Sequence, residues 1–387
     1  MLVPAFLAAF LCALVVQAQR GGPDPKDDPF KGVTADGTVQ PGLFAVRSTG
    51  VTTRPVVDAA RLFLEGLNPE QRRASTFAVD DGEWRQWNNV HRAQRAGIGF
   101  KDMTEEQRTR AFNLLKSALS AKGLEKTRSI MRLNQTIAEM TKRFEEYGEW
   151  LYHLTVMGEP HATEPWGWQL EGHHLIVNYF VLGDQVVMTP TFMGSEPVIA
   201  EAGAYAGTRV LQDEQGKGLA LMQALAPEQQ QKALMETGPK TANRAQGQAF
   251  RDNLQLPYAG IRASELNAKQ RALLTDLIAE YVGNMPEGHA KVRMAEVRAH
   301  LDATYFGWVG EFAPDSVFYY RIHSPVILIE FDHQTPVALP GPKVPNRQHV
   351  HSVVRTPNGN DYGKDLLRQH YERHKHDTAH GHAAAGR

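Results

Sequence analysis

The feature that most constrains the fold of this chain is a set of landmarks that occurs twice. Ala96-Gly97-Ile98 is followed by Gln107-Arg108, and Ala259-Gly260-Ile261 is followed by Gln270-Arg271, each landmark being repeated 163 residues later. Similarity at one fixed offset indicates a repeated structural unit. We therefore expect an internal duplication, with the two copies related by a pseudo-two-fold axis.

Each copy has the pattern of helices followed by strands. Thr104 with Gln107, and Asn267 with Gln270, have the spacing of a capping box at a helix start. Alternating and β-branched segments follow, with the short spacings of antiparallel hairpins. This order predicts an α+β fold. The expected strands are 151–157, 170–182 and 185–192 in the first copy, and 305–309, 318–332 and 348–355 in the second.

The organisation along the chain follows from composition. Residues 1–18 begin with an apolar run and end in small residues, which predicts a signal peptide and an exported protein. An uncleaved anchor is the alternative, although the run is shorter than the roughly 20 residues of a membrane span. Residues 19–53, rich in Gly, Pro and Asp, predict an extended leader. The remaining parts are a core domain, 54–373, containing pseudo-repeats 57–222 and 223–373, and a His-rich tail, 374–387.

Charge and cysteine content exclude several classes of function. The formal net charge is −1, so no global electrostatic attraction favours nucleic acid or an anionic membrane, and a small-molecule ligand is the expected partner. The only cysteine, Cys12, lies in the predicted signal peptide. A cleaved chain would have no thiol nucleophile, disulfide or cysteine-based zinc site. Any metal must therefore be held by histidines and carboxylates. The composition does not predict an oligomeric state.

The first candidate site is His349-Val350-His351. Residues i and i+2 of a strand face the same side, so both imidazoles could bind one ion. Neutral imidazole suits zinc, copper, iron or nickel. The alternative is two half-buried histidines that bond to neighbouring strands. The aligned positions of the first copy hold Val186 and Met188, so the shared scaffold does not require these histidines.

The second candidate is the pair His173 and His174, which follows Glu171-Gly172. Within the expected strand 170–182 the two histidines would point to opposite faces, so only one would normally join a given site. The second copy aligns Ser324 and Pro325 here, so these histidines also belong to one half only. A partly exposed pair at the start of a strand is the alternative.

The third candidate combines Arg321 and His323 with Glu330. An arginine on a strand is suited to bind a carboxylate or phosphate through two hydrogen bonds. Glu330 follows an apolar run and would be costly to bury without a cation or donors. It is expected to be a metal ligand, a general base, or the ion-pair partner of an arginine such as Arg355.

Further candidates lie on either side of these motifs. Arg355 could orient an anionic substrate group, and Asp361 is expected either to cap the helix that follows or to contact a ligand. The aromatic residues Trp166, Trp168 and Tyr320 are core residues or a substrate platform. The histidines of the tail either bind transition metals loosely or are solvated.

Several of these motifs, in this order, resemble one known family, an uncharacterised one called domain of unknown function 3500. The resemblance covers about residues 55–373 and implies an exported protein without an assigned activity. The motifs that carry it are Pro165-Trp166-Gly167-Trp168-Gln169-Leu170-Glu171-Gly172-His173-His174, Thr189-Pro190-Thr191-Phe192-Met193-Gly194, Tyr319-Tyr320-Arg321-Ile322-His323, Ile329-Glu330-Phe331-Asp332, His349-Val350-His351 and Asn360-Asp361-Tyr362-Gly363-Lys364-Asp365-Leu366-Leu367.

From the residues themselves we predict one composite site built by both halves. His173 or His174 would come from the first copy, and His349, His351 and Glu330 from the second. A divalent metal, zinc or copper, with an open position would favour hydrolysis. One alternative is a non-enzymatic exported protein that binds a metal or small ligand. The other is a metal-free site in which arginines and histidines bind a carboxylate.

Overall fold

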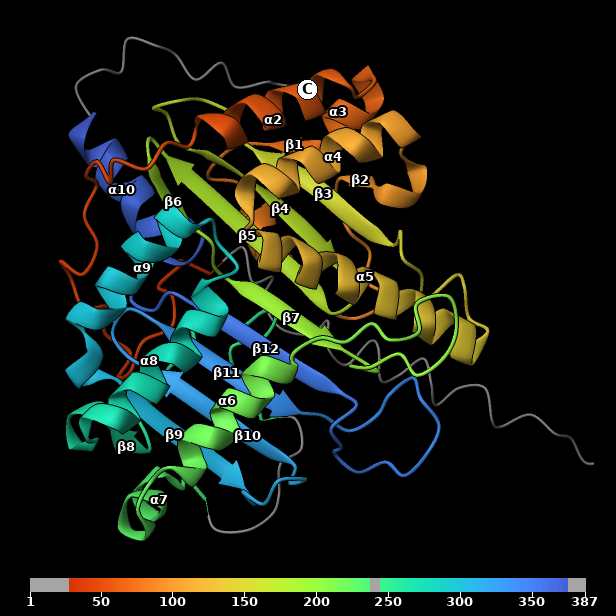
Figure 1. The fold of residues 1–387 in the computed structure, drawn as a ribbon. Coiled ribbons are helices and arrows are strands. Elements are labelled where there is room, and N and C mark those ends of the chain that lie inside the picture. The colour runs from red at the N-terminus through yellow and green to blue at the C-terminus, as the bar shows by residue number, and fades with distance from the viewer. Residues whose placement is uncertain (1–27, 237–243, 375–387) are drawn as a thin grey trace, which may run out of the picture.

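The computed structural model describes residues 28–236 and 244–374. Within these ranges it contains nine α-helices and a single twelve-stranded sheet, which confirms the α+β class (Figure 1). The predicted signal peptide, and the tail beyond His374, lie outside the described residues. None of the helices in the described ranges is both long enough and apolar enough to cross a bilayer.

The elements alternate between helical and strand-rich stretches along the chain. The α-helices are α2 (Arg54–Glu65), α3 (Pro69–Ser75), α4 (Glu105–Ala118), α5 (Ala121–Thr141), α6 (Gln212–Gln223), α7 (Pro227–Ala233), α8 (Ala268–Val282), α9 (Glu287–Ala299) and α10 (Lys364–Arg373). The strands are β1 (Thr76–Phe77), β2 (Ile98–Gly99), β3 (Tyr152–Met157), β4 (Trp166–Gly172), β5 (Leu175–Leu182), β6 (Gln185–Val187), β7 (Thr191–Ser195), β8 (Ile261–Arg262), β9 (Tyr305–Gly310), β10 (Phe318–His323), β11 (Leu328–His333) and β12 (Val350–Arg355). Short 3₁₀ helices are η1 (Gly82–Arg85), η2 (Phe100–Asp102), η3 (Ala263–Glu265), η4 (Leu301–Ala303) and η5 (Asp361–Gly363).

The sheet joins the two halves of the chain through one central pair of strands. Its order is β1-β3-β4-β5-β7-β12-β11-β10-β9-β8, with β2 on β3 and β6 on β5. The β1–β3 pairing is parallel and every other pairing of the named strands is antiparallel. At the centre β7 pairs with β12, where Phe192 lies opposite Val353. Strands β1–β7 therefore form one side of the sheet and β8–β12 the other.

Local sequence signals fix where the long helices begin. The Thr104 hydroxyl accepts a hydrogen bond from Gln107 N at 3.2 Å, and the Gln107 side chain accepts one from Thr104 N at 2.9 Å. Asn267 and Gln270 exchange the same two bonds, both at 3.0 Å. Each box satisfies N–H groups that an uncapped helix leaves without partners. Both predicted capping boxes are confirmed.

Two of the expected strands are hairpins instead. The segment 170–182 is divided between β4 and β5, and 318–332 between β10 and β11. The apolar residues on both sides of each turn hid the break, although Gly172 precedes the first turn and Ser324-Pro325 begins the second. This difference matters for the site, because the first turn consists of His173 and His174.

Both faces of the sheet are covered. Helices α2, α4, α5, α6, α8 and α9 lie over one face, which is toward the viewer in Figure 1, and its core includes Trp166, Trp168 and Tyr320. A second core, which includes Trp87 and Phe192, lies on the other face under the N-terminal segment and α10. Because the central strands are buried on both faces, their sequences are nearly continuous runs of apolar residues.

Candidate metal centre

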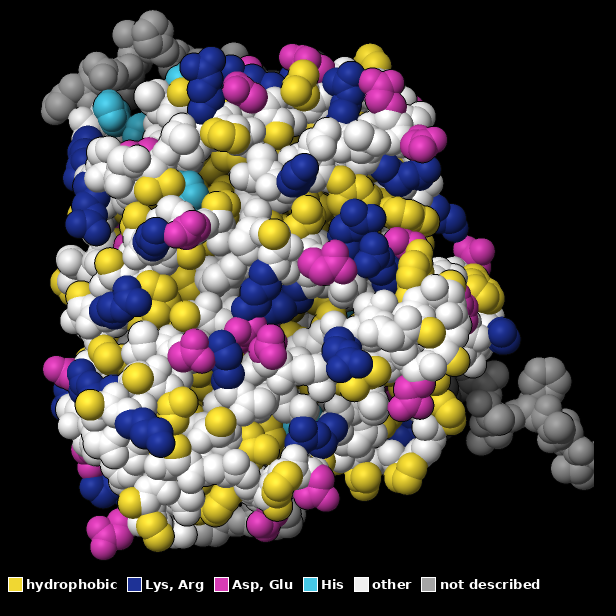
Figure 2. Space-filling view, in the orientation of Figure 1, with side chains coloured by type: hydrophobic (Ala, Val, Ile, Leu, Met, Phe, Trp, Pro, Cys, Tyr) yellow, Lys and Arg dark blue, Asp and Glu magenta, His cyan; other side chains and the backbone are white. Residues whose placement is uncertain are grey.

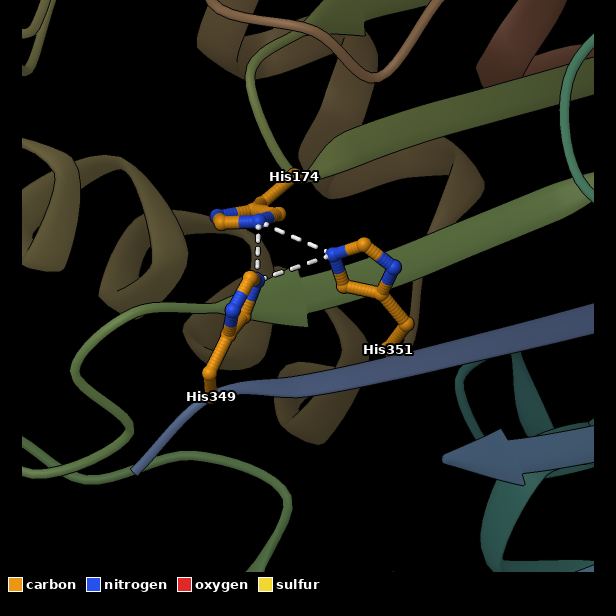
Figure 3. A group of neighbouring side chains, drawn as sticks. All are labelled: His174, His349 and His351. Carbon is orange, nitrogen blue, oxygen red and sulfur yellow. Dashed lines mark hydrogen bonds between the residues drawn. The ribbon is translucent and has the colours of Figure 1, made fainter. Parts of the chain in front are cut away.

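Three histidines from distant parts of the chain meet where the two halves join. His174 lies in the turn between β4 and β5, His349 immediately precedes β12, and His351 lies on β12. Figure 3 shows their rings converging on one point. The three Nε2 atoms are 3.1–3.2 Å apart: His174 to His349 3.2 Å, His174 to His351 3.1 Å and His349 to His351 3.1 Å. Within the described residues they form a cluster that could bind a metal ion.

The β7–β12 ladder sets this geometry, and a glycine makes room for it. His351 lies opposite Gly194, whose N–H donates a hydrogen bond to His174 O at 2.8 Å. A Cβ at position 194 would lie 3.1 Å from His351 Cδ2 and 3.3 Å from His174 Cδ2. Contacts this short would force the rings to move. Gly194 therefore permits the approach of the β4–β5 turn to β12.

The expectation that His173 and His174 would point to opposite faces of a strand is wrong, because the two residues form a turn. His174 has φ +63°, a left-handed conformation that is uncommon outside glycine. The two rings stack with centroids 3.9 Å apart. His173 Nδ1 is hydrogen-bonded to Asn134 Oδ1 of α5 at 2.8 Å. His173 therefore supports the His174 ring from behind.

The three clustered rings are buried and their pKa values are lowered. His174, His349 and His351 are 4%, 3% and 8% exposed. Burial lowers the pKa of His174 and His351 well below the usual value of an imidazole, and the neighbouring rings add to this effect. Burial also lowers the pKa of His349, although nearby Glu196 opposes it. Near neutral pH the rings are therefore uncharged, as metal ligands must be.

Hydrogen bonds at the outer ring nitrogen orient His349. Its Nδ1 lies 2.8 Å from Thr335 O and 3.5 Å from Glu196 Oε2. A carbonyl oxygen only accepts, so this bond places the proton on Nδ1 and leaves the Nε2 lone pair directed at the cluster. Glu196 also accepts backbone bonds from residues 337–339, which holds the following loop against the site.

The converging nitrogens cannot satisfy one another. Each Nε2 has either one N–H or one lone pair directed at the common centre, so three mutual hydrogen bonds cannot all form. A cation at that centre would accept all three lone pairs. A tetrahedral zinc ion with bonds of about 2.0–2.1 Å holds its ligand nitrogens about 3.3 Å apart, close to the spacing seen here. The residues present therefore fit a metal ion.

The structure does not bring Glu330 to this cluster. Its carboxylate accepts hydrogen bonds from Gln246 N at 3.0 Å, Gly247 N at 2.6 Å and the Tyr319 hydroxyl at 2.5 Å. Donors rather than a cation compensate for its burial. Its neighbour Asp332 accepts a bond from Ala245 N at 3.0 Å, and burial raises the pKa of Asp332 to about 8. The two carboxylates anchor the backbone of residues 244–247 to β11.

Arg355 and Asp361 form a separate buried network. Arg355 Nη1 lies 2.7 Å from Asp252 Oδ1 and 3.1 Å from Asp361 Oδ2. Asp361 also accepts Thr356 N at 2.7 Å, and burial raises the pKa of Asp361 to about 6 although Arg355 opposes the shift. Arg355 Nε donates to Gly247 O at 2.7 Å. These contacts tie β12 to the 244–252 segment and to the start of α10.

The remaining predicted residues lie on both sides of the sheet. Arg321 and His323 are buried on the same face as Glu330, and His323 packs against the Tyr258 ring with centroids 4.5 Å apart. Burial and the charge of Arg321 lower the pKa of His323 to about 3. Trp166, Trp168 and Tyr320 lie in the core of the helical face, away from the three histidines.

Sequence reasoning missed three residues that shape the cluster. Asn134 and Glu196 carry no signal in the sequence, because their partners are far away along the chain. Asn134 contacts His173, 39 residues later, and Glu196 contacts His349, 153 residues later. Gly194 is the one of the three that carries a signal in the sequence, because a glycine within an apolar strand can mark the close approach of another segment.

Comparison with known proteins identifies the family. The sequence model described as "Protein of unknown function (DUF3500)" matches residues 49–364, most of the chain. The chain belongs to the DUF3500 family. This confirms the resemblance found in the sequence, and the matched region contains all three clustered histidines. No curated protein and no solved structure matches the chain. Membership in DUF3500 assigns no reaction, so function must be argued from the site.

Proposed function

We propose that this DUF3500 protein binds a divalent metal ion, most favourably zinc, through Nε2 of His174, His349 and His351. The observation that carries the proposal is the convergence of three buried, uncharged imidazoles with nearly equal Nε2 separations of 3.1–3.2 Å. Burying three imidazoles around one point without a shared partner is costly, and a metal ion removes that cost.

The shape of the triangle favours zinc over divalent copper. Square-planar copper places two of any three ligands opposite each other, about 4 Å apart. No pair of Nε2 atoms in the cluster is separated by more than 3.2 Å. Tetrahedral zinc tolerates this compact arrangement and would retain one further coordination position. Copper remains the second choice of metal.

The open position makes metal-assisted hydrolysis the reaction that this centre supports best. Catalytic zinc sites have three protein ligands and a water, whereas structural sites have four protein ligands. The metal acidifies its water toward neutral pH and so supplies the nucleophile. Arg321, Arg355 and Glu330 have structural contacts elsewhere, so no substrate role is proposed for them.

A second candidate function is metal or ligand binding without catalysis. Two observations favour it: the three rings are at most 8% exposed, and the carboxylate beside the cluster, Glu196, already accepts backbone bonds. A protein of this kind would bind zinc but turn over no ester, amide or phosphate. Hydrolysis that depends on the bound metal separates the two candidates.

We also infer that the two halves arose by duplication, and matched contacts support this. Gln107 Nε2 donates to Gly66 O at 2.9 Å, at the end of α2. Gln270 Nε2 donates to Ala224 O at 2.9 Å, at the end of α6. The two glutamines are 163 residues apart, which is the offset of the sequence landmarks.

The order of elements supports the same inference. β3-β4-β5-β7 on one side of the sheet correspond to β9-β10-β11-β12 on the other, and the two series meet at β7 and β12. In this correspondence α6 is the counterpart of α2. The second repeat would therefore begin at Gln212, and not at residue 223 as expected from the sequence. Likewise β7, and not the segment with Val186 and Met188, would be the counterpart of the strand that carries His351.

Export is a further part of the proposal. It rests on the apolar N-terminal run that ends in small residues at 16–18. In an exported protein, a site made only of imidazoles has an advantage, because it contains no thiol that could oxidise. The His-rich tail could collect metal in the same compartment.

The test is metal content in chains that end at His374, so that histidines of the tail do not contribute. The zinc-loaded parent is expected to retain about one zinc ion per chain after dialysis. His174→Ala and His351→Ala should retain almost none, whereas the matched control His323→Ala, another buried histidine, should keep the metal. Full zinc content in both cluster variants would overturn the proposal.

A further inference from the structure

A cleft opens on the helical side of the sheet, between the central strands and helices α8 and α9. Met193 and Ser352, which pair across the β7–β12 ladder, lie on its floor. Their neighbours Gly194 and His351 belong to the metal cluster and face the opposite side of the sheet, because strand residues alternate. The cleft and the metal centre therefore lie back to back on one ladder. A molecule in the cleft does not touch the metal ligands.

The walls of the cleft are mainly apolar. They include Met188, Val282, Met285, Val292 and Ile327. A concave, mostly apolar space with a few polar groups is the usual form of a small-molecule site. On the side of the molecule seen in Figure 2, basic and acidic side chains are interspersed, so charge attracts no particular macromolecule to that face.

One polar group in the cleft lacks a partner in the described part of the chain. Asn284 follows α8, lines the cleft and is 3% exposed. Its Oδ1 accepts no hydrogen bond, and its Nδ2 makes only a long contact of 3.8 Å with Met193 Sδ. A buried carboxamide has one acceptor and two donors to satisfy, and leaving them unpaired is costly. Asn284 thus presents an unused donor and an unused acceptor side by side.

The charged groups of the cleft are already compensated. Arg293 donates to Val326 O at 2.6 Å and to Thr356 Oγ1 at 3.0 Å, and it pairs with Glu296 at 2.8 Å. His289 is 6% exposed, and burial lowers its pKa, so its ring is uncharged near neutral pH. No net charge is left for an ionic ligand to neutralise. These groups favour a neutral ligand.

We propose that this cleft is a second ligand site, which takes a small neutral molecule with an apolar body and an amide group. The amide would donate to Asn284 and accept from it, while the apolar body would contact the methionine and valine side chains. Because an amide offers a donor beside an acceptor, it matches Asn284 in either orientation of that side chain. The proposal stands apart from the metal centre and does not depend on it.

The experiment compares two neutral amides with the same octanoyl chain, one with N–H donors and one without. Octanamide carries two amide N–H groups, and N,N-dimethyloctanamide carries none. Binding of each to the full chain is measured by isothermal titration calorimetry. Octanamide is expected to bind roughly three- to tenfold more tightly, which corresponds to about one net hydrogen bond, the one that its N–H donates to Asn284 Oδ1. Octanoate and octylammonium, the charged analogues, should bind more weakly than octanamide.

Two variants assign the binding to the cleft. Asn284→Leu keeps the size of the side chain and should bring the affinities of the two amides together. Val292→Trp, at a half-buried wall position, should fill the space and abolish binding of both probes. A far-UV circular dichroism spectrum and a urea denaturation midpoint close to those of the parent show that each variant is folded. Equal binding of the two amides to the parent, no octanamide binding, or undiminished binding by folded Val292→Trp would each overturn the proposal.

Discussion

His174 and His351 bring their Nε2 atoms within 3.1 Å of each other although 177 residues separate them in the chain. One belongs to the β4–β5 turn and the other to β12, so their approach depends on the central β7–β12 ladder. A site divided in this way exists only in the folded protein. Metal binding and folding should therefore be coupled.

Zinc should stabilise the protein, because it binds the folded state far better than the unfolded chain. At a free zinc concentration 100 times the dissociation constant, the free energy of unfolding should rise by about 2.7 kcal/mol. Chemical denaturation with and without zinc measures the effect. His351→Ala should lose the zinc-dependent increase, while His323→Ala should keep it. An equal increase in both variants would place the metal outside the cluster.

Gly194→Ala should damage the metal centre. The new methyl group would lie 2.7 Å from Val350 O and 3.1 Å from His351 Cδ2, so the ladder or the ring must shift. We expect zinc affinity to fall at least about tenfold, as it does when the groups that orient metal ligands are disturbed. Competition with a zinc-binding dye measures the affinity.

Gly216→Ala is the matched control for that substitution. Gly216 lies on the exposed side of α6, and a Cβ there meets nothing within 4 Å. Alanine in a helix should raise the free energy of unfolding by about 0.5–1 kcal/mol and leave zinc affinity unchanged. Unchanged zinc affinity in both glycine variants would show that the cluster tolerates a side chain at position 194.

The sequence predicted the two metal ligands from the second half of the chain better than the one from the first half. His349 and His351 are separated by one residue on a strand, and the period of a strand alone places both rings on one side. His174 could be named but not placed. Its position depends on a two-residue turn in which His174 is left-handed, a conformation that histidine adopts far less often than glycine.

Long-range partners explain what could not be predicted. Glu330 was expected to need a cation or donors when buried, but the sequence gives no reason to place the backbone N–H groups of Gln246 and Gly247 beside it. Likewise, Arg355 pairs with Asp252, which lies 103 residues earlier in the chain. Two carboxylates and an arginine on adjacent strands resemble a catalytic set in the sequence. In the fold they attach one loop to the sheet. The helix starts were predictable because capping boxes act over three residues.

Glu330→Gln should therefore lower stability and leave the metal centre intact. The amide would retain one acceptor but would direct N–H groups at backbone N–H donors of residues 246 and 247. We expect the free energy of unfolding to fall by about 1.5–3 kcal/mol, the range for hydrogen bonds to a charged group. Tyr319→Phe, which removes one donor, should cost about 1 kcal/mol. Loss of zinc from Glu330→Gln without loss of stability would instead indicate that Glu330 is a zinc ligand or a general base.

His323 should make the protein sensitive to acid. Burial lowers its pKa to about 3 in the folded state, while an exposed histidine has a pKa near 6.5. Between these values the unfolded chain binds a proton that the folded chain does not, so stability present at neutral pH is lost as the pH falls below 6.5. The loss from this one group is about 2 kcal/mol between pH 7 and pH 5. His323→Phe removes the titrating ring. Between pH 7 and pH 5, the free energy of unfolding of this variant should therefore fall by about 2 kcal/mol less than that of the parent. Urea denaturation of both metal-free proteins at each pH measures the difference. Equal losses in the two proteins would mean that the ring is protonated, or in contact with water, in the folded state.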